Sequence, residues 1–146
     1  MRLGEDEARA RLAAQDHGVL CTVHRERGVD AVPVVYVLDD GYVGVPIDRV
    51  KPKASSRLQR ERNLEADPRA TLLVDHWDRD DWSQLWWVRV DGTGEVVDPI
   101  ASVHADALAA KYAQYRETRP AGACIVVSDL RYRGWRYTAA ESGRRL

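Results

Sequence analysis

The sequence predicts a mainly β domain in which an antiparallel barrel or sheet is covered by a few helices. Two observations favour this class over a doubly wound fold, and a third concerns nucleotide binding. The strand-like runs are short, mostly alternate in polarity and are separated by tight turns that contain glycine. Helical segments separate groups of strands. In a doubly wound fold, by contrast, a helix follows almost every strand. The chain has no GxGxxG after a strand and no Walker loop, so the standard nucleotide fingerprints are absent.

The elements of the first half follow in order. Residues 4–15, GEDEARARLAAQ, place acids before arginines, which suits a helix dipole and predicts a helix. The next three runs, residues 17–24, 29–39 and 42–47, are rich in β-formers and are separated by ERG and DDG. Such spacing is typical of an antiparallel meander of three strands.

The second half alternates helices with pairs of strands. Residues 55–67, SSRLQRERNLEAD, predict a helix whose N-cap is Ser56, with Gln59 three residues on as a capping box. Beyond it we expect strands over residues 71–77 and 82–98, the second bent near Gly92 and Gly94, then a helix over 99–118 and two strands over 121–139.

Length and composition predict a single domain over residues 1–146. Folding of 146 residues buries roughly 70% of the unfolded surface, enough for a core. The net charge of −1 gives no overall case for nucleic acid or an anionic membrane, so any anion site must be local. No window approaches the roughly 18 apolar residues of a membrane span, and Cys21 and Cys124 lie in apolar runs that suit a reducing compartment. We therefore expect a cytoplasmic protein.

The strand with the sequence QLWWVRV carries unusual bulk on both faces. Leu85 and Trp87 point to one side, whereas Trp86 and Val88 point to the other. Either both faces are covered within the monomer, or one face meets a partner or a flat ligand. Trp77 nearby adds to a possible aromatic surface.

The segment IDRVKPKASSRLQ predicts an anion site. Two of the three lysines of the chain, Lys51 and Lys53, point the same way on an extended segment that Pro52 stiffens. A helix start follows, where free N–H groups and the dipole attract anions. The alternative is a solvated basic loop. The candidate anion-binding residues are Lys51, Lys53, Ser55, Ser56, Arg57 and Arg60.

Four stretches together resemble a known family over about residues 10–138. These are RNLEADPRA, TLLVD, VDGTGEVV and the closing DLRYRGWRYT. They resemble the flavin/deazaflavin split-barrel family, also called pyridoxamine-phosphate-oxidase-like, and the KPK and WW features resemble an actinobacterial subgroup that uses coenzyme F420. The resemblance implies a six- to seven-stranded antiparallel split β-barrel of the FMN-binding type. It also implies a homodimer with two cofactors in grooves at the interface.

The resemblance also implies roles for individual residues. In similar proteins the lysine after the third strand, here Lys53, holds the cofactor phosphate, with a basic residue two before it, here Lys51. An aromatic residue of the partner's long strand closes the groove, and Trp87 matches that position best. The residues implied to lie along the ring are Val32, Pro33, Val34, Pro46, Ile47 and Asp48. The helix after Lys53 looks longer than in better-known members, and the arginine and histidine pattern of true pyridoxamine-phosphate oxidases is not found, which argues against that activity.

These features together predict an oxidoreductase that transfers hydride between reduced coenzyme F420 and a small, planar, unsaturated substrate. An FMN enzyme of the same fold is the alternative, because a phosphate site suits both; the arginines at the helix start, Arg57, Arg60 and Arg62, favour the acidic tail of F420. A carrier or sensor that binds F420, FMN or a tetrapyrrole-like ligand without turnover also fits, as does a pure interaction domain. No catalytic residue is assigned, since the chemistry belongs to the cofactor.

Other polar candidates carry little chemistry. Tyr36, Asp48 or His76 can be considered as a proton donor. His76 lies among loop aspartates, but a first-row metal usually takes two or more His or Cys ligands at defined spacing, so no metal site is expected. His104 with Asp106 is expected to be a surface pair, and Cys21 has no histidine motif for nucleophilic catalysis.

Overall fold

The structure is a computed structural model that describes residues 1–48 and 58–139. Seven strands form one antiparallel sheet in the order β2-β1-β5-β6-β7-β4-β3, which confirms the mainly β split-barrel fold. The strands are β1 (Gly18–His24), β2 (Gly28–Val34), β3 (Val37–Asp39), β4 (Tyr42–Pro46), β5 (Arg69–His76), β6 (Trp86–Val97) and β7 (Cys124–Arg136).

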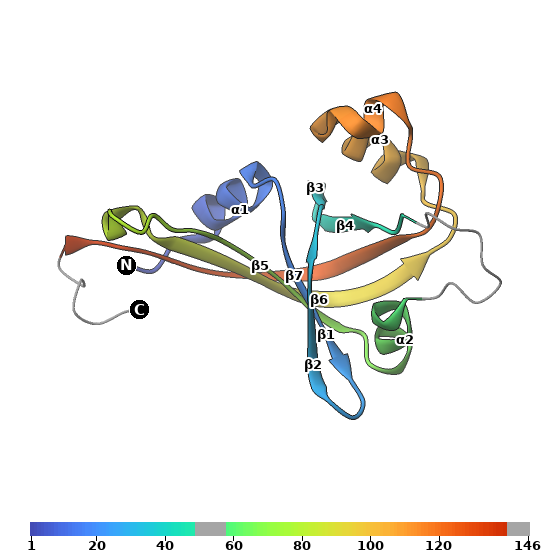
Figure 1. The fold of residues 1–146 in the computed structure, drawn as a ribbon, viewed down its shortest axis with the longest axis horizontal. Helices are drawn as coiled ribbons and strands as arrows, with labels where there is room; N and C mark the ends of the chain where they lie inside the picture. Colours follow the sequence, from blue (N-terminus) through green and yellow to red (C-terminus); the bar gives the residue numbers. More distant parts are fainter. Residues whose placement is uncertain (49–57, 140–146) are drawn as a thin grey trace.

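The helices lie around this sheet. They are α1 (Glu5–Ala14), α2 (Gln59–Ala66), the 3₁₀ turn η1 (Trp82–Gln84), α3 (Ser102–Lys111) and α4 (Ala113–Glu117). In Figure 1, α1 and α2 lie on opposite sides of the long β6–β7 pair, and α3 and α4 stand beyond β3 and β4. The helix predicted over residues 4–15 is confirmed, and the alternation of β1 and β5 follows the predicted strands.

The core fills the space between the inward faces of the strands. Val88 and Val90 of β6 are almost fully buried, and α1 adds Leu12 at 0% exposure. Trp86 packs against this core, whereas Trp87 points to the outer face. The predicted alternation of the WW strand is therefore confirmed, and only one of the two indoles is used in the core of the monomer.

One predicted strand is wrong in a way that changes the topology. The run over residues 29–39 forms two strands, β2 and β3, which lie at opposite edges of the sheet. The chain crosses between them at Val35 and Tyr36. The Tyr36 ring is fully buried with its hydroxyl donated to the Leu12 carbonyl, and the Tyr36 carbonyl accepts from Lys111 Nζ at 3.0 Å. Side chains thus satisfy backbone groups that a strand partner would have taken.

Three further boundaries differ from the prediction. The helix expected over 99–118 breaks into α3 and α4 at Tyr112, whose backbone is extended. The two closing strands are one strand, β7, which turns at Asp129 with φ of 56°. The segment over 82–98 begins as η1 before β6, and its predicted bend is a register shift between Asp91 and Thr93.

Within residues 1–48 and 58–139, no helix has the length and apolar character needed to cross a membrane.

Candidate functional site

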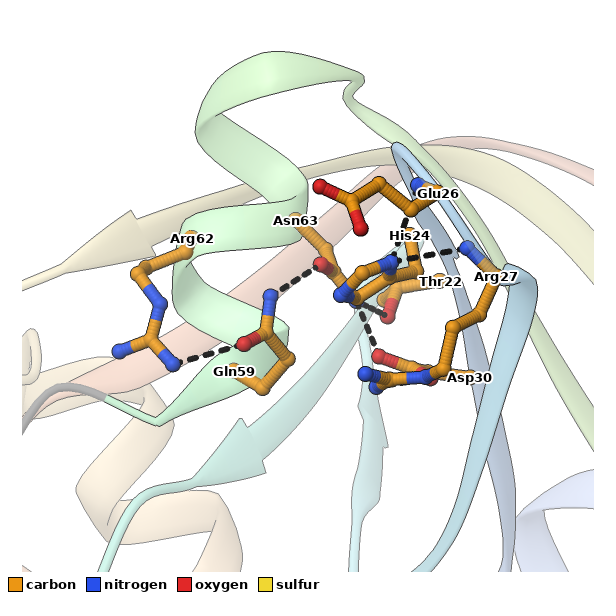
Figure 2. Close-up of polar contacts among 8 residues, drawn as sticks. All are labelled: Thr22, His24, Glu26, Arg27, Asp30, Gln59, Arg62 and Asn63. Carbon is orange, nitrogen blue, oxygen red and sulfur yellow. Dashed lines mark hydrogen bonds and ion pairs between the residues drawn. The ribbon is translucent and has the colours of Figure 1, made fainter.

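Helix α2 is held in place by a buried amide. Figure 2 shows Asn63 reaching from α2 toward β1 and β2. Its Nδ2 donates to Thr22 Oγ1 and to Asp30 Oδ2, both at 2.9 Å, and its Oδ1 accepts from Gln59 Nε2 at 2.9 Å. Asn63 and Thr22 are both almost fully buried, so these bonds are shielded from water. The asparagine in the RNLEADPRA motif therefore fixes the helix to the sheet.

The turn between β1 and β2 completes this network. His24 Nδ1 accepts from the backbone N–H groups of Glu26 and Arg27, each at 3.0 Å, and Arg27 Nη2 lies 2.8 Å from Asp30 Oδ1 (Figure 2). The hydrogen bond from Asn63, followed by that from Arg27, lowers the pKa of Asp30. The carboxylate is therefore ionised at neutral pH and accepts from both groups.

The start of α2 differs from the predicted capping box. The helix begins at Gln59, and the backbone N–H of Leu58 donates to Glu61 Oε2 at 2.7 Å. The capping side chain at the third helical position is thus Glu61, and Gln59 is the first residue of the helix. The predicted N-cap, Ser56, lies outside the described residues.

Arg60 is the predicted anion-binding residue that the structure describes. It lies in the first turn of α2 and is half-buried, and its Nε is buried without a hydrogen-bond partner among the described residues. Burial lowers the pKa of its guanidinium group. A buried guanidinium nitrogen without an acceptor is destabilising, and an anion at the helix start would satisfy it.

A groove lies beside the end of β4. It has a volume of about 870 Å³, and its walls include Ile47, Asp48 and Tyr115 together with the segment from Glu117 to Gly122. Pro46 and Ile47 are buried, whereas Asp48 is exposed and accepts a hydrogen bond from Tyr115 Oη at 2.8 Å. Burial and then the Asp48 contact raise the pKa of Tyr115, so the phenol remains a donor at neutral pH.

The remaining residues of the predicted anion site cannot be placed. Lys51, Lys53, Ser55, Ser56 and Arg57 lie outside the described residues. In the chain they connect Asp48 at the groove with Leu58 at the start of α2.

The three predicted site residues of β2 do not share one face. Val34 is buried in the core and Val32 packs against it, whereas Pro33 is exposed on the outer face. Pro33 is registered with Val19 of β1, and Val19 with Leu73 of β5. Only Pro33 can therefore present its side chain to a ligand on the outer face.

The two predicted tryptophans lie far from the groove within one chain. Trp87 is near the start of β6, whereas Val97 at its other end is registered with Cys124, which pairs with Pro46. Trp87 and Val97 are ten residues apart, so at ~3.3 Å per residue they are separated by about 33 Å. Trp77 follows the end of β5, is 52% exposed and lies 6.2 Å from Trp82 between ring centroids. A single chain does not bring these indoles to Asp48.

The three candidate proton donors lie in different environments. The Tyr36 hydroxyl is buried against the Leu12 carbonyl, and burial raises its pKa, so it cannot serve a ligand. His76 lies at the end of β5 with Nε2 at 3.2 Å from Gln84 Oε1, away from the groove. Asp48 is the one of the three that lines the groove.

Sequence reasoning missed two pairings. The Tyr115 hydroxyl binds Asp48, and the spacing of Tyr112 and Tyr115 at i and i+3 was the available signal. His104 was expected to pair with Asp106, which is wrong. Its Nδ1 faces Asp39 Oδ2 at 3.5 Å, whereas Asp106 binds Arg119 at 2.6 Å.

The part of the chain that the structure describes contains no group of three or more side chains placed to hold a metal ion. Both cysteines are free thiols, and burial raises the pKa of Cys124 to about 11. Cys124 is fully buried as the sequence predicts, while Cys21 is only half-buried.

Several solved structures share this fold. A conserved hypothetical protein from Mycobacterium tuberculosis matches with a TM-score of 0.70 at 20% identity, covering 92% of this chain and 85% of that one. A FAD-binding protein from Mesorhizobium loti matches with a TM-score of 0.58 at 17% identity, covering 92% and 93%. The FAD-binding protein from Mycobacterium smegmatis matches with a TM-score of 0.59 at 16% identity, covering 94% and 98%.

The chain also matches a family model over most of its length. The model is described as pyridoxamine 5'-phosphate oxidase, and the match extends over residues 5–138. It includes all seven strands and the helix that Asn63 anchors. The chain therefore belongs to the pyridoxamine 5'-phosphate oxidase family.

Proposed function

We propose that the protein is a cofactor-dependent oxidoreductase that binds the deazaflavin coenzyme F420 and transfers hydride to or from a small, planar, unsaturated substrate. The FAD-binding proteins among its structural neighbours support a flavin-type ligand in this fold. The observation that carries the proposal is the buried Nε of Arg60 at the start of α2, which has no hydrogen-bond partner among the described residues. The KPK segment, residues 51–53, comes before α2 in the chain.

The residues present fit an anionic cofactor. Arg60 offers a guanidinium nitrogen that lacks an acceptor, and the first turn of α2 offers free N–H groups. Lys51 and Lys53 add two ammonium groups between Asp48 and α2 in the sequence. Asn63 fixes the helix, so this end of α2 is a rigid support for a phosphate.

The cofactor, when bound, supplies the hydride chemistry. The chain positions and shields it. The groove beside β4 offers the buried edge of Ile47 and a carboxylate, Asp48, which the Tyr115 hydroxyl holds in one orientation. Asp48 is the group of this chain best placed to accept a proton or a hydrogen bond from a substrate in that groove.

We propose that two copies of the chain complete the site in a cytoplasmic homodimer. Trp87 and Asp48 lie at opposite ends of one chain, so an indole can close the groove only if it comes from a second copy. The outer face of β2 and β1 is apolar and open, and Leu73 continues it onto β5 between Thr71 and Asp75; Val29 is 69% exposed and Leu73 is 37% exposed. Such a face is typical of a surface that a partner covers.

A binding titration tests the cofactor assignment. Purified protein is titrated with F420, FMN and FAD in parallel, with ligand fluorescence as the readout. F420 is expected to bind, and Lys53→Ala and Arg60→Gln are each expected to weaken it by about tenfold, the loss for a charge-assisted phosphate contact. Arg25→Gln, which removes an exposed arginine in the β1–β2 turn, is the charge-matched control and is expected to change affinity less than twofold.

The alternatives give different results in the same assay. Binding of FMN or FAD without F420 would keep the fold and replace the cofactor. Binding of none of the three would leave an interaction domain as the better description. Turnover is tested with the loaded protein and a panel of unsaturated carbonyl compounds; binding without turnover on any of them would indicate a carrier or sensor.

A further inference from the structure

A second cluster of positive charge lies on the outer face of the sheet, separate from the groove at β4. It forms a pocket of about 290 Å³ between the ends of β6 and β7 and the first residues of the chain. The pocket is lined by Arg2, Trp87, Arg89, Arg133, Gly134 and Trp135. We call it the triple-arginine pocket.

The register of the sheet forces these charges together. Arg89 of β6 is directly opposite Arg133 of β7, and Trp87 is directly opposite Trp135. Arg2 is joined to Trp135 by an isolated antiparallel bridge, and the next residue, Leu3, donates its N–H to the Gly134 carbonyl at 2.9 Å. Like charges directly opposite each other on one face of an antiparallel pair are destabilising.

The described residues do not neutralise this cluster. Asp91 is the one carboxylate in an ion pair with it; its Oδ2 lies 3.7 Å from Arg89 Nε, beyond hydrogen-bond reach. Arg89 Nε is itself buried and has no hydrogen-bond partner, and neither Arg2 nor Arg133 forms an ion pair within the described part of the chain. Three guanidinium groups and one carboxylate leave a net positive charge of two in a small concave space.

We propose that the triple-arginine pocket is a binding site for a small molecule that carries two negative charges, either a dicarboxylate or a phosphate. The guanidinium fork matches both oxyanions bidentately, and such an anion would bridge the repelling pair Arg89 and Arg133. The volume corresponds to about ten waters at ~30 Å³ each, enough for a compact anion and too little for a macromolecule. The indoles of Trp87 and Trp135 supply apolar walls.

The position of the pocket connects it with the outer face but not with α2. Arg89 is registered with Leu73 of β5, Leu73 with Val19 of β1, and Val19 with Pro33 of β2. The pocket thus lies at one end of a row that runs from Pro33 across the apolar outer face. Trp87 is also the residue proposed to close the groove of a second copy, but the three arginines belong neither to α2 nor to the KPK segment, so failure of the cofactor assignment and failure of this inference are distinguishable.

The experiment measures anion binding by isothermal titration and by the shift in unfolding temperature. The probes are inorganic phosphate and succinate, with acetate as the singly charged comparison, all at constant ionic strength. Phosphate or succinate is expected to bind and to raise the unfolding temperature, and acetate to bind at least tenfold more weakly. Preference between phosphate and succinate identifies the chemical source of the oxyanion.

Two substitutions and one matched control locate the site. Arg89→Gln and Arg133→Gln are each expected to weaken the preferred anion by about tenfold or more. Arg131→Gln removes the same charge from an exposed position on the same strand, outside the pocket, and is expected to change affinity less than twofold. The wild type and the three variants are each measured with and without the additional substitution Lys53→Ala. An anion that binds at the KPK segment is then recognised because its binding is lost with Lys53→Ala.

A second readout separates binding from folding. Without an anion and at low salt, Arg133→Gln is expected to unfold at a higher temperature than the wild type, because it removes a like-charge pair. An anion effect that survives in Arg89→Gln and Arg133→Gln, or that vanishes with Lys53→Ala alone, would overturn the inference. So would the absence of anion binding together with a changed monomer–dimer equilibrium in Arg133→Gln, which would assign the arginines to carboxylates of a second copy.

Discussion

Asn63 shows how one polar side chain sets the position of an element. Its amide group bonds to β1 through Thr22, to β2 through Asp30 and to its own helix through Gln59. The motif that contains it was visible in the sequence, but its burial was not. Thr22 lies 41 residues earlier in the chain, and nothing in the local pattern of either residue indicates that they meet.

Removing this amide is expected to loosen α2 and weaken cofactor binding indirectly. Asn63→Ala leaves the buried Thr22 hydroxyl without a partner, which predicts a loss of about 1–3 kcal/mol in the free energy of unfolding. Urea denaturation at pH 7 measures it. Gln59→Ala removes a less buried amide from the same helix and is expected to cost less than about 1 kcal/mol. Equal losses in the two variants would contradict the anchoring role of Asn63.

The same network predicts a pH dependence. The pKa of Asp30 is lowered in the folded protein, so its contribution is present above its unfolded pKa of about 3.9 and is lost as the pH falls through the folded value. The difference in stability between wild type and Asn63→Ala is therefore expected to shrink as the pH is lowered from 5 toward 3. A difference that stays constant over that range would exclude Asp30 as the titrating partner.

At the scale of elements, the sequence was most informative where periodicity and turn residues agreed. The helix over 4–15, β1, β5 and the two-faced β6 were predicted because their patterns are local. The break at Val35 and Tyr36 was missed because neither residue is a typical turn former. In place of a strand partner, the Tyr36 carbonyl accepts hydrogen bonds from Lys111 and Tyr112, which lie some 75 residues away in the chain.

The bend in the β6–β7 pair depends on Gly92. A Cβ built at this position would clash with the Ser128 carbonyl oxygen, where the register shifts. Gly92→Ala is therefore expected to force the two strands apart and to lower the free energy of unfolding by about 2 kcal/mol or more.

Gly44→Ala is the matched control for that substitution. A Cβ at Gly44 in β4 would meet its neighbours at 3.5 Å or beyond, which is ordinary contact. Its effect on thermal or urea unfolding is expected to stay within about 1 kcal/mol. If both variants unfold alike, the close approach at Ser128 is not what fixes the bend.

At the scale of the whole molecule, the predicted site residues lie in two places that are far apart within one chain. The sequence placed Trp87 and Asp48 in one site through a family resemblance, and the structure places them at opposite ends of β6 and β7. No pattern in a single chain reveals which residues of a second copy face it. The apolar outer face is the feature of the fold that supports such a copy.

Leu73→Glu tests the proposed dimer. Leu73 is 37% exposed at the middle of β5 on the outer face, so a charge there is tolerated in a monomer but not in a desolvated interface. The wild type is expected to sediment as a dimer and the variant as a folded monomer with weakened cofactor binding. Glu95→Lys, an exposed charge change on β6, is the control. A wild-type monomer that binds the cofactor would remove the need for a second chain.

The pairing of the first residues with β7 has a consequence for synthesis of the protein. Leu3 donates to Gly134, and the Arg136 N–H donates to the Met1 carbonyl at 2.9 Å. Residues 1–3 thus find their partner strand only after β7 has emerged from the ribosome. β4 also pairs with β7, so the sheet is incomplete until β7 has been synthesised, and strand edges exposed before then must avoid premature pairing.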